Sequence, residues 1–404
     1  MRIAIYENLP PGGAKRAAYE HGRYLAARHE IDLYRLSTTP TEAFDLAPLA
    51  RQTFTYRFSP VRGALDAQIA RGKVTPRFYT VFGPLQRLHR QMADDVAGRG
   101  YDVVLAHIDS YTQAPRLLRW IRSVPTVYFC QEPFRRFLEQ HNLEENRRGL
   151  RGLRLGRLRE AEYMWTLSRL DRDDQRSTRA ATAIAANSLF SRERIWAAYG
   201  RNATVCYPGV DAQRFTPQAG QRRCELLSVG IASKAKGHDL VIEALARVPR
   251  ETPRPALRIA TWTSGADALR RLAEERDVEL ILESALDDAA MLERYRGALA
   301  TVCAARLEPL GLSPLESMAS GTPVIAIREG GFRETVLEGR TGILVEPEPR
   351  QIAAAITKLA RDPEPAARLG EEGRRHAVAS WGWERGGSRL ERLLHETASR
   401  SAPG

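Results

Sequence analysis

The sequence has few cysteines, no long apolar run and no internal repeat. Its four cysteines are scattered and form no C-x-x-C pair, so they predict neither a zinc site nor a disulfide framework. No stretch approaches the roughly 20 apolar residues of a membrane-spanning helix. The first residues, MRIAIYENLPPGG, lack the apolar core and cleavage pattern of a signal peptide. We therefore expect a cytoplasmic protein.

The charge balance is strongly basic, with a formal net charge of +12 over 404 residues. Such a balance suits nucleic acid, an anionic membrane surface or phosphorylated substrates, and charge alone does not choose among them. Residues 146–159, NRRGLRGLRLGRLR, contain six arginines and no acid. Two interpretations of this segment are equally consistent with its composition. It is either a basic amphipathic stretch that binds the inner face of a membrane or an exposed arginine-rich surface.

Strand-like and helix-like segments alternate along the first half of the chain. Apolar strands are expected at residues 2–6, 31–36, 101–109 and 125–133, and helices at 14–28 and 111–122. This alternation predicts a parallel sheet with helices on both faces, where ligands bind beyond the carboxyl ends of the strands. The polar or glycine residues at those ends are Gly12, Gly13, His107, Asp109 and Gln131.

A second alternating series begins after the polar stretch 212–223, which we interpret as a linker. Its strands are expected at 224–230, 257–261, 300–305 and 323–327, with a helix at 236–248. The fold class is therefore α/β, with two Rossmann-like, doubly wound domains facing each other across a cleft. We expect domains at 1–207 and 208–380, and a closing helix at 381–404.

The segment 308–316, EPLGLSPLE, carries two carboxylates on either side of a turn and a helix start. Pro314 suits the first turn of a helix, and Ser313 is a good N-cap. Because Glu316 follows Ser313 by three residues, the segment also predicts a capping box. A capping box alone leaves Glu308 unexplained.

A phosphate is the ligand that this helix start favours. The backbone N–H groups of Gly311, Leu312 and Ser313 are expected at the positive end of the helix. Lys234 and Lys236, in the first turn of the second domain, can neutralise a diphosphate or can be solvated surface lysines. Spacing alone does not decide between these two interpretations.

These segments, in this order, resemble a family 4 glycosyltransferase of the GT-B fold, which retains anomeric configuration. The E-x7-E motif of that family corresponds to Glu308 and Glu316. The other matching segments are NSLFSRERI, YPGVDAQRF, SVGIASKAKGHD, PVIAIREGGFRE and TGILV. The resemblance extends over most of the chain and is strongest from about residue 185 to 347.

The resemblance implies a donor site for a UDP- or GDP-sugar. Glu308 would be catalytic, contacting donor hydroxyls and supporting charge in the transition state, and Glu316 would hold the ribose. Gly311 and Leu312 would donate N–H groups to the diphosphate beside Lys236. The other donor-binding residues would be Gly12, Gly13, Lys234 and Ser313. Neither a cofactor nor a metal is expected, because lysine and helix dipoles can replace the metal.

The acceptor side is expected in the first domain. His107 would be catalytic and lie near the transferred sugar, and Asp109, Gln131 and Arg135 would contribute to the acceptor side. The family often has histidine where Gln131 stands, which makes His107 the better candidate for proton handling. Alternatively, His107 is a strand-end histidine satisfied by hydrogen bonds.

Two further features bear on the chemistry. Many members have arginine where Ile231 follows the glycine of the phosphate turn. Either Lys234 compensates for this difference, or the chain binds the diphosphate less tightly. The D-x-D sequence at 171–173 lies in an Arg/Asp-rich helical run and is interpreted as a solvated face rather than a metal site.

The sequence therefore predicts a retaining transferase that moves a mannose- or glucose-type hexose from a nucleotide sugar. The acceptor would be a glycan, a lipid-linked molecule or a small molecule, in polysaccharide or glycoconjugate biosynthesis. The alternatives are a nucleotide-sugar epimerase or phosphorylase on the same scaffold, and a non-catalytic basic protein that binds membrane or RNA. Nucleic acid is disfavoured because no binding motif with stacking aromatics is visible.

Overall fold

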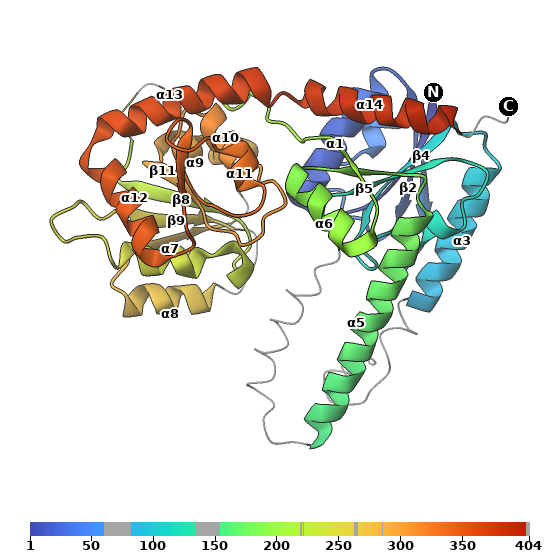
Figure 1. Cartoon of the computed structure of the whole chain (residues 1–404), viewed down its shortest axis with the longest axis horizontal. Coiled ribbons are helices and arrows are strands. Elements are labelled where there is room, and N and C mark those ends of the chain that lie inside the picture. Colours follow the sequence, from blue (N-terminus) through green and yellow to red (C-terminus); the bar gives the residue numbers. More distant parts are fainter. Residues whose placement is uncertain are drawn as a thin grey trace. The chain divides into compact units, whose positions relative to one another are not determined.

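The computed structural model describes residues 1–59, 82–133, 154–218, 220, 222–261, 266–284 and 286–400, with the backbone alone for residues 154–164 and 166. The chain divides into two compact units, Met1–Cys206 with Gly386–Gly404, and Tyr207–Arg385. Each unit is a doubly wound α/β structure with its own parallel sheet (Figure 1). Among the described residues, no helix has the length and apolar content needed to span a bilayer.

The first unit is built on a seven-stranded sheet in the order β3-β2-β1-β4-β5-β6-β7. Every neighbouring pair of strands is parallel, as the alternation of the sequence predicts. Its elements are β1 (Arg2–Asn8), α1 (Gly13–Ala26), β2 (Glu30–Leu36), η1 (Ala47–Leu49), β3 (Gln52–Tyr56), α3 (Gly83–Ala97), β4 (Val103–Asp109), η3 (Arg116–Arg119), β5 (Thr126–Cys130), α5 (Arg154–Ala180), β6 (Ala183–Ala186), α6 (Leu189–Tyr199), β7 (Thr204–Val205) and α14 (Trp383–Ser399).

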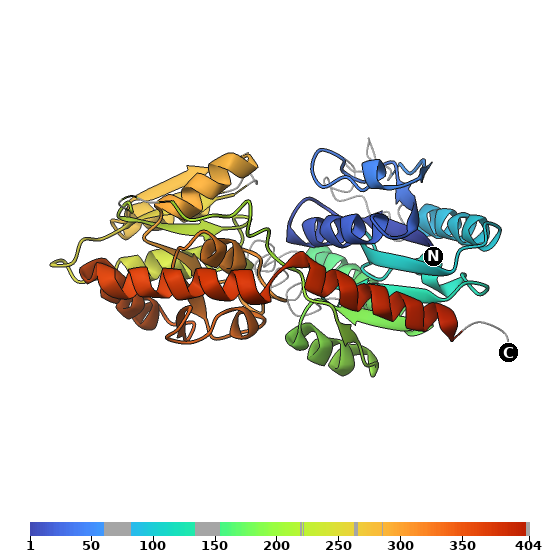
Figure 2. The ribbon, with the colours of Figure 1, turned by 90° about the horizontal axis from the view of Figure 1, so that it is seen from above.

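Side chains that alternate along β1 supply the two cores of this unit. Ile3 and Ile5 face a cluster that includes Leu25 of α1 and Leu390 and Leu394 of α14. The opposite face packs against α3, η3 and α6. Figure 2 shows α14 running across the first face, so this C-terminal helix is part of the core of the first unit.

The helix expected at 111–122 is wrong. Only the four-residue turn η3 forms there. The Asp109 carboxylate accepts hydrogen bonds from the backbone N–H groups of Tyr111 (2.8 Å) and Thr112 (2.9 Å). A side chain that binds the backbone in this way stabilises a turn in competition with a helix. Pro115 disfavours the helical conformation for the residue before it.

The second unit has a six-stranded sheet in the order β10-β9-β8-β11-β12-β13, also parallel throughout. Helices α7, α8 and α12 lie on one side of it, and α9, α10 and α13 lie on the other (Figure 1). Its elements are β8 (Glu225–Val229), η4 (Lys234–Lys236), α7 (His238–Leu245), β9 (Ala256–Ala260), α8 (Asp267–Glu275), β10 (Leu280–Glu283), α9 (Asp288–Gly297), β11 (Ala300–Cys303), α10 (Ser313–Ala319), β12 (Val324–Ile327), α11 (Phe332–Thr335), β13 (Gly342–Val345), α12 (Pro349–Arg361) and α13 (Pro363–Ser380).

Residues 212–223, which we interpreted as a linker, belong to the second unit in the structure. Phe215 is 1% exposed and lies in the apolar core of that unit. The Arg222 guanidinium donates to the carbonyl oxygens of Gly321 (2.6 Å) and Ala298 (3.2 Å). The polar composition of this stretch does not reveal its buried aromatic residue, Phe215, or its half-buried hydrogen-bonding arginine, Arg222.

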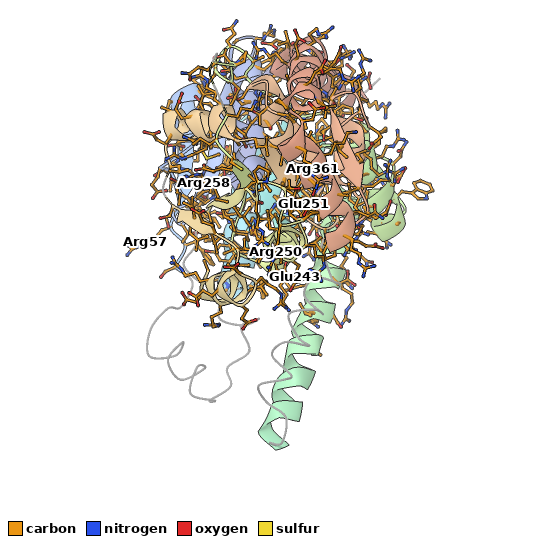
Figure 3. The ribbon with its side chains drawn as sticks, turned by 90° about the vertical axis from the view of Figure 1, so that its left-hand side faces the viewer. Arg57, Glu243, Arg250, Glu251, Arg258 and Arg361 are labelled. Carbon is orange, nitrogen blue, oxygen red and sulfur yellow. The ribbon has the colours of Figure 1, made fainter. Side chains whose placement is uncertain are left out.

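Charged pairs on the second unit hold its helices and strands together at the surface. Arg361, the last residue of α12, donates to Glu251 and to the Thr252 hydroxyl, both at 2.8 Å (Figure 3). Arg258 of β9 lies between Glu225 and Glu283 of the neighbouring strands. Such partly exposed pairs contribute little stability individually, so the buried core remains the main support of the unit.

Candidate functional site

The loop after β11 is shaped by a pair of glycines from a different loop. Gly331 donates its backbone N–H to the carbonyl oxygen of Glu308 at 2.8 Å. A Cβ at Gly330 would lie 2.4 Å from that oxygen, and a Cβ at Gly331 would lie 2.4 Å from Leu310 Cα. Leu307, just before Glu308, has a positive φ of 50°. Only glycine therefore allows the two loops to pack closely enough to hold Glu308 in place.

Lys236 and Glu308 meet at the end of this loop. The ammonium Nζ of Lys236 lies 2.8 Å from Oε2 of Glu308, with side chains 30% and 21% exposed. The lysine stem lies against Gly230, where a Cβ would be 3.1 Å from Lys236 Cδ. Arg306 donates its backbone N–H to Ala235 at 2.9 Å, which docks η4 onto the end of β11. Two predicted site residues, 72 positions apart, thus form one charged pair.

A buried histidine that the sequence did not single out holds the turn before η4. His238 is 1% exposed, and its Nδ1 lies 3.0 Å from the Ser228 hydroxyl. Its Nε2 lies 3.2 Å from the carbonyl oxygen of Ile231. Because a carbonyl only accepts, Nε2 carries the proton in this arrangement. Burial lowers the pKa of His238 to about 4, so the ring is neutral near pH 7.

Glu316 lies on α10, but the predicted capping box is wrong. Ser313 is the first helical residue, and no side chain in the described part of the chain caps this helix. The Ser313 hydroxyl instead lies 3.7 Å from the Cys303 thiol. The Glu316 carboxylate accepts a hydrogen bond from the fully buried Tyr295 hydroxyl at 2.7 Å. Tyr295 therefore orients this carboxylate.

The other predicted donor-binding residues of this unit lie in η4 and around the start of α10. Gly311, Leu312 and Ser313 are half-buried around the start of α10. Gly311 has a φ of 86°, and a Cβ there would lie 2.5 Å from the Phe332 ring. Lys234 is exposed at the start of η4. The carboxyl ends of β8 and β11 thus collect a lysine turn, two carboxylates and a helix start.

In the first unit, the Gly12-Gly13 turn begins α1. Gly12 has a φ of 142°, and no heavy atom of the described residues lies within 4 Å of where its Cβ would be. Lys15 follows it and is 1% exposed, with its Nζ 3.5 Å from the buried Glu7 carboxylate and hydrogen-bonded to the Pro40 carbonyl. Burial raises the pKa of Glu7, and the charge of Lys15 opposes that shift. No motif in the sequence indicates this buried pair.

His107 is buried at the end of β4. Its side chain is 1% exposed, and neither ring nitrogen has a hydrogen-bond partner among the described residues. The ring stacks on Phe129, with centroids 5.7 Å apart. Burial, with a smaller contribution from His21, lowers the pKa of His107 to about 3. His107 is therefore neutral near pH 7, and it is not the hydrogen-bonded histidine of our alternative interpretation.

Asp109 and Gln131 make internal contacts. The Asp109 carboxylate is 2% exposed and accepts from the Tyr6 hydroxyl at 2.5 Å and the Asn8 amide at 3.1 Å, besides the turn contacts given above. Gln131 donates its amide to the Ala14 carbonyl at 2.9 Å, which ties β5 to the first turn of α1. Arg135 lies outside the described residues.

The D-x-D sequence is an ion-paired segment rather than the solvated face that we expected. Asp173 pairs with the buried Arg116 and accepts from Arg119 at 3.1 Å. Asp171 accepts from Gln175 one turn further along α5. These contacts connect α5 to η3, and they give Asp173 a structural role.

Known families match both units of this chain. The profile described as Glycosyltransferase Family 4 matches residues 11–214, and that described as Glycosyl transferases group 1 matches residues 210–376. A GDP-mannose-dependent alpha-(1-6)-phosphatidylinositol monomannoside mannosyltransferase from Mycolicibacterium smegmatis is 34% identical over 242 residues, 53% of this chain and 62% of that protein. A D-inositol 3-phosphate glycosyltransferase from Geodermatophilus obscurus is 35% identical over 231 residues, 51% of this chain and 50% of that protein.

Solved structures match over nearly the whole chain. The sucrose-phosphate synthase of Thermosynechococcus elongatus has a TM-score of 0.74 at 19% identity, covering 99% of both chains. Anabaena HepE in complex with UDP and glucose has a TM-score of 0.69 at 17% identity, covering 98% of this chain and 99% of that chain. These similarities show the two-domain GT-B fold. The aligned regions span less than two thirds of the length of the two curated relatives above.

Proposed function

Because this chain belongs to glycosyltransferase family 4, we propose that it is a retaining transferase of nucleotide-diphosphate sugars. It moves a hexose of the mannose or glucose type to a glycan, lipid-linked or small-molecule acceptor. The observation that carries this proposal is the Lys236–Glu308 pair, held at 2.8 Å where the carboxyl ends of β8 and β11 meet. In open α/β sheets that edge is where ligands bind.

The pair provides both signs of charge that sugar transfer requires. As the bond from the anomeric carbon to the diphosphate lengthens, positive charge develops on the sugar and negative charge on the leaving group. Lys236 stabilises the leaving diphosphate, and Glu308 binds donor hydroxyls and supports the positive charge. Losing one preorganised contact of this kind costs roughly a hundredfold or more in rate. Glu308 is assigned no nucleophilic step, because the leaving phosphate can deprotonate the acceptor during front-face attack.

The rest of the second unit binds the nucleotide in this proposal. The backbone N–H groups of Gly311 and Leu312, with Ser313, donate to the diphosphate, and Lys234 adds a second positive charge. Glu316 accepts from the ribose hydroxyls, with Tyr295 fixing one of its oxygens. The Tyr295 contact supports this role because a carboxylate oriented from one side can accept from a ligand on the other. These groups bind the diphosphate without a metal.

The first unit contributes the acceptor side. The Gly12-Gly13 turn provides the open backbone that a phosphate or sugar can approach. We assign His107 a hydrogen-bonding role, because a neutral imidazole with a pKa of about 3 neither donates nor takes a full proton near pH 7. Gln131 positions the start of α1, and the buried Asp109 shapes the acceptor-side loop.

The first donor to test is GDP-mannose. One relative, at 34% identity, carries the name of a GDP-mannose-dependent mannosyltransferase. UDP-glucose is the second candidate, since the contacts above involve the sugar, ribose and diphosphate rather than the base. If the acceptor is lipid-linked, we propose that the protein works at the inner surface of the membrane. The arginine-rich segment 146–159 is the proposed contact, although residues 146–153 lie outside the described part of the chain.

A thermal-shift screen of nucleotide sugars tests the proposal. The matched donor should raise the melting temperature by mass action, and its free hexose should not. Incubation of that donor with and without acceptor, followed by product analysis, separates transfer from epimerisation, because an epimerase converts the donor alone. If no nucleotide sugar stabilised the protein or were consumed by it, the proposed function would be wrong.

A further inference from the structure

Three side chains from opposite ends of the chain converge in the first unit. His29 lies in the turn between α1 and β2, and Glu391 and His395 lie on α14. One ligand atom from each residue can be chosen such that all three lie within 4.8 Å of one another. We infer that His29, Glu391 and His395 form a site for a divalent transition-metal cation of the zinc class.

The arrangement is suited to a small tetrahedral cation. Glu391 and His395 are four positions apart on one helix and therefore share a face. The His29 Nε2 lies 2.8 Å from Oε1 of Glu391, and the two histidine rings are 5.5 Å apart between centroids. Ligand atoms about 2.1 Å from a tetrahedral zinc lie roughly 3.4 Å from one another. The ligand atoms lie within 4.8 Å of one another, so binding would require the side chains to turn toward a common centre.

The ligand chemistry also fits. Two imidazoles and one carboxylate form a known zinc set that leaves a fourth position for water. His29 would bind the cation through Nε2, the ring nitrogen that faces Glu391. Binding through Nε2 places the ring proton on Nδ1. The Met1 amine, 3.4 Å from that nitrogen, would then lose this hydrogen bond.

A second set of contacts orients the carboxylate. The Tyr24 hydroxyl of α1 donates to Oε2 of Glu391 at 3.1 Å, which leaves Oε1 toward His29. Gly387 allows the Tyr24 ring to lie against α14, because a Cβ there would be 2.4 Å from Tyr24 Cγ. Hydrogen bonds of this kind to a ligating carboxylate fix its direction in metal sites.

The cation would fasten α14 to the rest of the first unit. Leu390 and Leu394 already bury the apolar face of this helix, and the proposed site adds a link at its edge between residues 362 positions apart. None of the three ligands is among the residues that we assign to the donor or acceptor side, so we assign this site a structural role. The proposed sugar transfer does not require this cation.

The test uses the untagged full chain, because a histidine tag would itself bind metal. Co²⁺ is titrated first, since its visible absorption reports coordination, and Zn²⁺ then displaces it. We expect one equivalent bound, a tetrahedral Co²⁺ spectrum, and a higher melting temperature with Zn²⁺. His395→Ala removes an exposed ligand and should weaken binding by at least about tenfold. Glu391→Gln should do the same while still able to hydrogen-bond to Tyr24.

Glu396→Gln is the matched control. It makes the same charge change at the exposed neighbour of His395 on α14, and it should leave the affinity and the spectrum unchanged. Circular dichroism checks that each variant folds. Absence of saturable binding by the wild type, or equal affinities for the wild type and His395→Ala, would overturn the proposal. Equal weakening by Glu396→Gln would do so too, because it would indicate a general charge effect.

Discussion

Asp174 on α5 gives the first unit a stability that falls as the pH rises. The side chain is 1% exposed and accepts from the Ala114 N–H at 3.0 Å and the Tyr199 hydroxyl at 2.6 Å. Burial outweighs those two hydrogen bonds and raises the pKa of Asp174 from 3.8 to about 7. The folded state therefore holds a proton that the unfolded state releases.

The sign and size of the effect follow from linkage. Because the folded pKa is raised, the contribution of Asp174 is fully present below about pH 4 and is lost as the pH rises through about 7. At 1.36 kcal/mol per pKa unit, the loss reaches an upper bound of about 4 kcal/mol. Asp174→Asn keeps the shape and has no charge to bury. Its oxygen accepts from Ala114, and its amide donates to the Tyr199 oxygen.

Urea unfolding of the wild type and Asp174→Asn at pH 5, 6, 7 and 8 measures this effect. The Asn variant should gain free energy of unfolding relative to the wild type from pH 5 to pH 7, by up to about 3 kcal/mol, and the difference should level off by pH 8. Buried histidines such as His107 and His238 contribute equally to the free energy of unfolding of both proteins, so their contributions cancel in the difference. Parallel curves for the wild type and Asp174→Asn would refute the reasoning.

Two further variants probe the donor side. Gly331→Ala places a Cβ 2.4 Å from Leu310 Cα, so it should shift the loop that carries Glu308 and weaken donor binding at least about tenfold by calorimetry. Gly83→Ala, with open space around it, is the control and should bind donor normally. Tyr295→Phe removes a hydrogen bond worth about 1 kcal/mol, so it should raise the donor KM about fivefold with kcat nearly unchanged. Normal donor binding by Gly331→Ala, or an unchanged KM for Tyr295→Phe, would contradict these roles.

The sheet architecture was predictable because buried parallel strands are apolar runs bounded by turn residues. The expected strands at 2–6 and 300–305 correspond to β1 and β11, and the two sheets are parallel as predicted. Local competition explains the failures. At 111–122 the Asp109 side chain and Pro115 stabilise a turn instead of the expected helix. The spacing of apolar residues, on which we based the helix prediction, does not report either effect.

The site was partly predictable for a similar reason. The spacing of Glu308 and Glu316, and the lysine turn, are local features that the sequence displays directly. The contact of Tyr295 with Glu316, the support of the turn by His238 and the pairing of Lys15 with Glu7 depend on which residues the fold brings together. No local motif encodes such contacts.

The most direct test of the account is the effect of Lys236→Ala on turnover of the donor found in the screen, with GDP-mannose tried first. Loss of the Lys236 ammonium group should lower kcat at least about a hundredfold, and Glu308→Gln should do the same. Lys358→Ala, which removes an exposed lysine of α12, should remain within about threefold of the wild type, as expected for a surface charge. Turnover by Lys236→Ala and Glu308→Gln within that same range would contradict the assignment of this pair to sugar transfer.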